Sequence, residues 1–219
     1  MKFKLLLAAV AAASAMGAAS GASAQVLNFD DFKGTFNSVP SDYHGYTWTY
    51  WEVFNGAGYY NQQLGPVIEG TNGYTNGVVS SPNVACGCAN DFQASTSIIS
   101  GPSIGLNSGY FTSAWNDGET LTVNGYSGAN LVDTASFTIS TETPSFEMFG
   151  WSGLTEITFT PSGGTPQGYN GNGEYFAVDN LSLSGAVPEP AAWGMMLVGF
   201  FGLGGAMRAA RSRRSAVAA

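Results

Sequence analysis

The sequence predicts an all-β fold, an antiparallel β-sandwich of the jelly-roll or carbohydrate-binding-module type, followed by one C-terminal transmembrane helix. Apolar and polar residues alternate in several segments, as where Leu121 and Val123 follow Thr120 and Thr122 in turn. This period of two is typical of strands with one buried and one solvated face. Asn-Gly occurs six times, which favours hairpins, and helical periodicity is absent between Gln25 and Gly185.

The predicted strands follow one another at short intervals, a spacing that favours a two-sheet sandwich over a solenoid. In chain order they are Val26 to Phe32, Tyr46 to Phe54, Gly77 to Ser80, Phe92 to Ile99, Gly109 to Trp115, Glu119 to Tyr126, Thr134 to Thr141, Ser145 to Trp151, Leu154 to Thr160 and Tyr175 to Leu183.

The last predicted strand contains an irregularity. Phe176 and Val178 share one parity, whereas Leu181 and Leu183 have the opposite one. All four can face a core only if one extra residue is absorbed between them, so the sequence predicts a β-bulge around Asp179-Asn180.

Carboxylates near both ends of the sandwich suggest a metal site. Asp30 and Asp31 lie in the first strand, and first and last strands of a sandwich often lie side by side. Carboxylate and amide oxygens suit hard cations. We therefore predict a structural calcium site formed by Asp30 or Asp31 with Asp179, and with Asn180 nearby. The alternative is that these are solvated residues at strand ends and turns.

Aromatic residues dominate the second predicted strand. Tyr46, Trp48 and Tyr50 share one parity. If that face is exposed, the three rings form a ligand-binding platform on which sugars stack, and if it is buried they belong to the core.

The two cysteines occur as Cys86-Gly87-Cys88. Two ligands cannot complete a tetrahedral zinc site, which leaves a local disulfide, free thiols, or another metal or redox role. His44 is the single histidine of the chain, and its neighbours Asp42 and Gly45 are typical of a turn.

The N-terminus has the three parts of a secretory signal peptide. Lys2 and Lys4 precede an apolar run, and small residues end in Ala22-Ser23-Ala24. This order predicts export with cleavage after Ala24, so the mature domain spans residues 25–186.

The C-terminal segment, residues 187–219, combines a short apolar run with a basic end. Ala191 to Met207 is uncharged, and Arg208, Arg211, Arg213 and Arg214 follow. Since about 20 residues cross a bilayer, this is a marginal transmembrane helix. The arginines place the tail in the cytoplasm and the preceding domain outside.

In front of this helix stand Pro188-Glu189-Pro190 and, two residues later, Ala192-Trp193. The motif at 188–193, the helix at 191–207 and the arginines at 208–214 together resemble the PEP-CTERM sorting signal in its Trp-containing variant. The resemblance covers about the last thirty residues. It implies that an exosortase, a membrane cysteine peptidase, cuts near Pro190 after a transient stay in the inner membrane and transfers the protein to the cell envelope or extracellular matrix.

The domain also resembles secreted bacterial domains that accompany this signal. The resemblance rests on Phe29-Asp30-Asp31, on Gly45, Tyr46 and Trp48, on residues 76–80 and on residues 176–181. It implies a β-sandwich like galactose-binding or carbohydrate-binding modules. The Cys-Gly-Cys element departs from that pattern.

The charge of the domain limits the classes of partner that the protein can bind. All fifteen acidic residues lie between Gln25 and Pro190, together with a single base, Lys33, so this part is more acidic than the net charge of −8 for the chain. Such a surface repels phosphates and excludes nucleic acid as a partner. No G-x-S-x-G motif is present. We therefore expect a non-enzymatic envelope or matrix protein that contacts exopolysaccharide. The alternative is a carbohydrate-active hydrolase or lyase, which needs only two suitably spaced carboxylates.

Overall fold

A computed structural model describes residues 24–56, 72–88, 96–169, 171–185 and 199–202. The chain divides into two units, 1–186 and 187–219. The first unit contains the strands β1 (Gln25–Leu27), β2 (Phe36–Ser38), β3 (Thr47–Thr49), β4 (Glu52–Asn55), β5 (Asn83–Cys86), β6 (Ser97–Ser113), β7 (Asn116–Ser127), β8 (Asn130–Ile139), β9 (Ser145–Met148), β10 (Leu154–Pro166) and β11 (Phe176–Gly185), with a 3-10 turn, η1 (Tyr43–Gly45), and a short helix, α3 (Gly73–Asn76).

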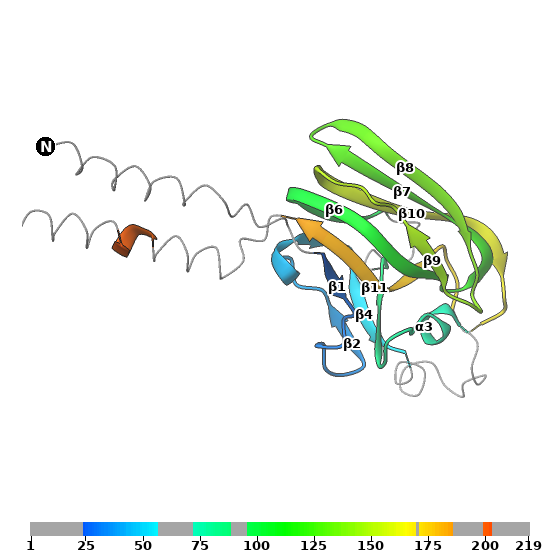
Figure 1. The fold of residues 1–219 in the computed structure, drawn as a ribbon. Helices are drawn as coiled ribbons and strands as arrows, with labels where there is room; N and C mark the ends of the chain where they lie inside the picture. Colours follow the sequence, from blue (N-terminus) through cyan, green and yellow to red (C-terminus); the bar gives the residue numbers. More distant parts are fainter. Residues whose placement is uncertain (1–23, 57–71, 89–95, 170, 186–198, 203–219) are drawn as a thin grey trace, which may run out of the picture. The chain divides into compact units, whose positions relative to one another are not determined.

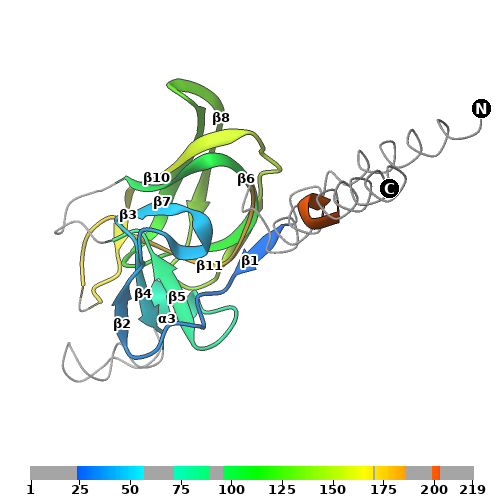
Figure 2. The ribbon, with the colours of Figure 1, turned by 90° about the vertical axis from the view of Figure 1, so that its left-hand side faces the viewer.

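The strands form two layers that share β6, and every pairing between them is antiparallel. The first half of β6 pairs with β3 and β10, and β7 and β8 continue that layer. The second half pairs with β9 and β11, and β5, β4 and β2 continue the other layer. Figures 1 and 2 show β6, β10, β7 and β8 in the first layer and β2, β4 and β5 in the second. The predicted antiparallel β-sandwich is confirmed.

A bend in β6 allows one strand to serve both layers. Opposite β10, the register shifts between the pair Ser100↔Glu156 and the pair Ile104↔Leu154. Gly101 and Pro102 lie in the interval. Proline has no N–H for a ladder bond and therefore suits an interruption of this kind.

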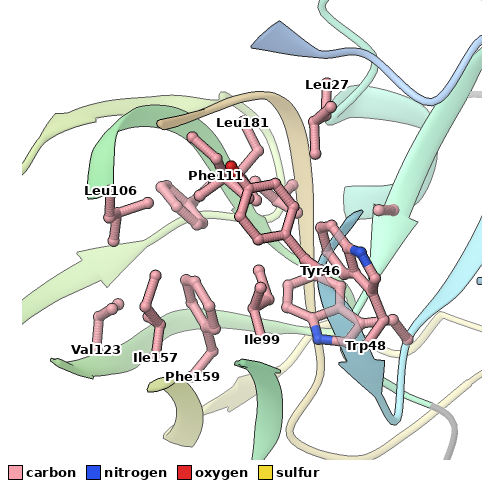
Figure 3. Packing of buried hydrophobic residues seen from close by; sticks show 14 of the residues in the cluster. Leu27, Tyr46, Trp48, Ile99, Leu106, Phe111, Val123, Ile157, Phe159 and Leu181 are labelled. Atoms are coloured by element: carbon pink, nitrogen blue, oxygen red, sulfur yellow. The ribbon is translucent and has the colours of Figure 1, made fainter. Parts of the chain in front are cut away.

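The main core lies between the two layers. Leu121, Val123 and Ile157 contribute from one layer, while Phe111 and Val178 contribute from the other. Figure 3 shows Phe111, Val123 and Ile157 in this core, together with Ile99 and Phe159. The alternation that predicted strands such as Glu119 to Tyr126 therefore reflects burial against a second sheet.

A second, smaller core covers the opposite face of the β4, β5 and β11 layer. Phe54, Val84 and Ala177 face it and pack with Tyr74 of α3. The Asn72 side chain caps α3 by accepting hydrogen bonds from the N–H groups of Tyr74 and Thr75. Part of this layer is thus buried on both faces, because α3 contacts β6 and β11.

The predicted bulge in the last strand is present. The register of β11 against β6 shifts between Asp179 and Ser182, and Asn180 has a φ of 50°. As a result, Phe176, Val178, Leu181 and Leu183 all enter the main core. The first and last strands also lie side by side, since β1 pairs with residues 181–183 of β11.

Several predicted strand boundaries were wrong. Gly77 to Ser80 follows α3 and is not a strand, and Val26 to Phe32 is extended only as far as Leu27, because the chain turns with Phe29 at a φ of 60°. The structure adds β2, β5 and α3, which were not predicted. Residues 92–95 of another predicted strand lie outside the described residues.

Asn-Gly was also a poor guide to hairpins. Asn72-Gly73 begins α3, and Asn124-Gly125 lies inside β7. The tight β7–β8 hairpin turns instead at Gly128-Ala129, where Ser127 pairs with Asn130.

Within the described residues, no helix is long and apolar enough to cross a membrane. Most of the predicted span, 191–207, lies outside those residues, and 199–202 are helical.

Candidate functional site

The predicted platform of Tyr46, Trp48 and Tyr50 does not exist, because two of its rings belong to the main core. Tyr46 is 4% exposed and Trp48 is 5% exposed. Figure 3 shows both among the core side chains, and Trp48 lies opposite Ile99 in the β3–β6 ladder. Tyr50 is exposed, but its φ of 66° ends the strand, so it does not continue the row. For Tyr46 and Trp48, the core alternative considered from the sequence is the correct one.

His44 occupies a turn, as its neighbours predicted. It is exposed in η1, with a φ of 53°. Its ring contacts Tyr43 and shares a hydrogen bond with the side chain of Gln25. Gln25 is an amide, and the Tyr43 hydroxyl donates to Asp31 rather than to His44, so these contacts do not pair His44 with a nucleophile.

Three of the four residues of the predicted calcium site, Asp30, Asp179 and Asn180, bind the loop of residues 79–83. Asp179 is completely buried and accepts hydrogen bonds from the N–H groups of Val79 and Ser80, both at 2.7 Å. The N–H of Asn180 also donates to Asp179, at 2.6 Å, and the hydroxyl of Ser80 donates to the side chains of Asp179 and Asn180.

Of the two earlier carboxylates, Asp30 binds the other end of the same loop, and Asp31 binds a tyrosine outside it. Asp30 accepts from the N–H of Asn83 at 3.1 Å, and Asp31 accepts from the hydroxyl of Tyr43 at 2.8 Å. Asp179 and Asp30 thus bind the two ends of residues 79–83. The described part of the chain contains no group of three or more His, Cys, Asp or Glu side chains arranged for a metal. Calcium binding by this set stays a prediction.

The two cysteines form a disulfide with each other. Cys86 is buried in the smaller core, where its sulfur lies 3.2 Å from the hydroxyl of Tyr74. Of the alternatives left open by the sequence, the structure has the local disulfide. Beside it, burial raises the pKa of Glu52.

An exposed aromatic surface lies elsewhere, on the outer face of β9 and β6. Phe146 pairs with Tyr110, and Met148 pairs with Ser108. We call these four residues the β9 face. Phe146 is 49% exposed and Met148 is 80% exposed, while the rings of Phe146 and Tyr110 lie 4.8 Å apart. Because Phe111 and Ser145 have the opposite parity and Phe111 lies in the core, the β9 face points outward.

Sequence reasoning missed the β9 face for a definable reason. Phe146 and Met148 alternate with Ser145 and Glu147 in a predicted strand, which marks a common face. Alternation does not reveal that this face is solvated, since apolar faces are normally buried.

A second unusual group is buried at the end of the main core. Glu119 of β7 is 0% exposed, and its carboxyl accepts a hydrogen bond from the hydroxyl of Ser113. Burial, and secondarily the nearby Glu174, raise the pKa of Glu119 to about 8, although the Ser113 hydrogen bond acts in the opposite direction. At neutral pH the folded protein therefore holds this group mainly protonated. Its parity with Leu121 and Val123 already placed it on the buried face.

The sorting motif lies outside the described residues. Pro188, Glu189, Pro190 and Trp193 and the arginines at 208, 211, 213 and 214 belong to this part, so their predicted role is unchanged.

Comparison with known proteins assigns neither a family nor a function to the chain. No protein-family model matches the chain, and no curated protein matches it. Among solved structures, a DUF4465 family protein from Bacteroides caccae is 15% identical, with a TM-score of 0.39, covering 76% of this chain and 94% of that one.

Two further solved structures are similar. A CBM61 module in complex with β-1,4-galactotriose is 7% identical, with a TM-score of 0.33, covering 63% of this chain and 86% of that one. An arabinose-bound GH51 α-L-arabinofuranosidase is 12% identical, with a TM-score of 0.37, covering 75% of this chain and 27% of that one. At these sequence identities and TM-scores, no residue role or activity of those proteins can be assigned to this chain.

Proposed function

We propose that this protein is an exported, non-enzymatic component of a bacterial envelope or extracellular matrix, and that its β-sandwich binds exopolysaccharide through the β9 face. The observation that supports binding is the adjacent pair of rings, Tyr110 and Phe146, on an outward sheet face. Aromatic rings offer apolar surface to sugar C–H groups, and the tyrosine hydroxyl adds a hydrogen-bonding group.

The charge of the domain limits which polysaccharides it can bind, according to their own charge. With Lys33 as its single base and all fifteen acids of the chain between Gln25 and Pro190, the domain has no cationic patch for an anionic polymer. Stacking on rings does not require charge on the sugar. We therefore propose a neutral glycan as the ligand.

Glycan binding by ring stacking makes a direct prediction. In the purified protein, Phe146→Ala and Tyr110→Ala are each expected to weaken binding to the best ligand of a glycan array about tenfold, which corresponds to about 1.4 kcal/mol. Isothermal titration calorimetry measures the change. Leu131→Ala is the matched control, since Leu131 is 53% exposed on β8, which pairs with β7 rather than with β9. Wild-type binding in both ring variants would refute the proposal.

The proposed sorting can be tested separately from glycan binding. We propose that the exosortase removes the arginine tail, with the membrane involved only during this step. Mass spectrometry of the mature protein from its host is expected to show an N-terminus at Gln25 and a C-terminus near Pro190. Cells lacking the exosortase are expected to retain Ala219. A wild-type protein that keeps Ala219 would contradict the proposal.

The alternative proposal is a carbohydrate-active hydrolase or lyase. One observation favours it, because Glu119 and Glu174 form a pair in which one carboxyl has a raised pKa, as a general acid requires. The complete burial of Glu119 argues against contact with a polymer. Release of reducing ends from polysaccharide by the wild type, lost in Glu119→Gln, would favour this alternative.

A further inference from the structure

Two buried acceptor atoms at the end of the main core have no hydrogen-bond partner among the described residues. They are Oε1 of Glu119 and Oδ1 of Asn116. Glu119 is 0% exposed and Asn116 is 7% exposed. A buried acceptor left unsatisfied destabilises the folded protein, so each of these two oxygens needs a hydrogen-bond donor or a cation as its partner.

Both residues converge on the backbone of Gly163 in β10. Glu119 lies directly opposite Gly163 in the β7–β10 ladder. The amide nitrogen of Asn116 donates to the Gly163 carbonyl at 3.0 Å, and the N–H of Gly163 donates to Oε1 of Glu174 at 2.6 Å. The backbone of one glycine thus links residues 116, 119 and 174, and the charge of Glu174 acts on the carboxyl of Glu119.

Two glycines of β10 allow its backbone to approach Asn116 and Glu119 of β7 closely. Gly163 and Gly164 have φ values of 74° and 78°. A Cβ on Gly164 would lie 2.8 Å from Cβ of Asn116 and 3.0 Å from the backbone nitrogen of Glu119. Both glycines are exposed, so the group lies just beneath the protein surface.

No basic side chain is placed to compensate these carboxylates. Between Gln25 and Pro190 the only base is Lys33, which lies in the loop after β1. In the absence of an ion, burial keeps Glu119 mainly protonated. A divalent cation that displaces this proton would satisfy the orphaned oxygens and compensate the carboxylates of Glu119 and Glu174 at once, which a bound water cannot do.

We propose that Glu119, Asn116 and Glu174 form a binding site for a hard divalent cation of the calcium class. These side chains supply the oxygen ligands that such an ion prefers, and solvent reaches the position beside Gly163 and Gly164. The site is separate from the β9 face and from Asp30, Asp31 and Asp179, and it does not depend on the proposed glycan binding.

The test is a calcium titration of the purified full-length mature protein, after dialysis against a chelator. Thermal denaturation is expected to show a rise in Tm of about 5 °C at millimolar calcium, since a ligand of the native state stabilises it. Glu119→Gln and, as a second variant, the half-exposed Glu174→Gln are expected to lose this rise. Circular dichroism establishes that each variant is folded, and terbium luminescence reports binding directly.

Two controls make the outcome decisive. Glu142→Gln removes an exposed carboxylate and is expected to keep the full rise in Tm. Asp30→Asn tests the other predicted calcium site and is also expected to keep it. The proposal is overturned if calcium leaves the wild-type Tm and terbium luminescence unchanged, or if folded Glu119→Gln and Glu174→Gln respond as the wild type does. A rise lost only in Asp30→Asn would assign the ion to the other site.

Discussion

Replacing Asp179 by alanine is expected to lower the free energy of unfolding by about 4 kcal/mol, a large effect for one residue. Its carboxylate is completely buried and accepts from the N–H groups of Val79, Ser80 and Asn180. Removing it leaves the three donors without this acceptor inside the protein. It also frees one end of residues 79–83, whose other end is held by Asp30.

Urea denaturation followed by tryptophan fluorescence measures this loss. Asp117→Ala is the matched control, because Asp117 also accepts from a hydroxyl, that of Ser140, and from an N–H, that of Thr141. Asp117 is partly exposed, so water can replace it, and a loss of about 1 kcal/mol is expected. Equal losses in the two variants would show that burial of Asp179 does not set its contribution.

The second large effect is a dependence of stability on pH that arises at Glu119. Its pKa is about 8 in the folded protein and 4.5 as an ordinary glutamate. Between these values the folded protein binds more protons than the unfolded chain, so stability falls as pH rises. The contribution of the protonated group is fully present below about pH 4.5 and is lost by about pH 8. Over this range the loss approaches about 4 kcal/mol.

Glu119→Gln is expected to remove that pH dependence, since an amide has no proton to lose and can still bond to Ser113. The measurement is urea denaturation of both proteins at pH 5 and pH 8 in the presence of a chelator. The variant is expected to be the more stable protein at pH 8. Glu142→Gln, at an exposed position, controls for the loss of one acid. A pH dependence in Glu119→Gln equal to that of the wild type would contradict the assignment.

The sequence was most informative where local periodicity and burial agree. The strand from Glu119 to Tyr126 was found because Leu121 and Val123 alternate with threonines, and both lie in the core. The bulge at Asp179-Asn180 was predictable because two apolar pairs of opposite parity cannot otherwise face one core. The pairing of β1 with β11 agrees with the expected neighbourhood of the chain ends.

The errors share one physical cause. Residues of equal parity along a strand share one face of the sheet, but parity does not tell whether that face is covered by other residues or by water. Tyr46, Trp48 and Tyr50 looked like one row, but Tyr50 adopts a φ of 66°, and Trp51 then turns into the core beside Trp48. Phe146 and Met148 share one parity in a predicted strand, but that parity alone does not tell whether their face is buried, and in the structure they are exposed. The calcium prediction joined Asp30 and Asp179 by strand adjacency; in the structure both accept hydrogen bonds from the loop of residues 79–83, and calcium binding there stays a prediction.

By itself, the sequence determined the all-β class, the antiparallel pairing of many short strands and the bulge, because these depend on alternation along the chain. The proposed location also follows from the sequence alone, because it rests on the resemblance of the two chain ends to export and sorting signals. Only the tertiary structure decided which aromatic rings are exposed and that Glu119, Asn116 and Glu174 meet at Gly163. Those properties depend on contacts between residues that are distant along the chain, and local periodicity gives no information about such contacts.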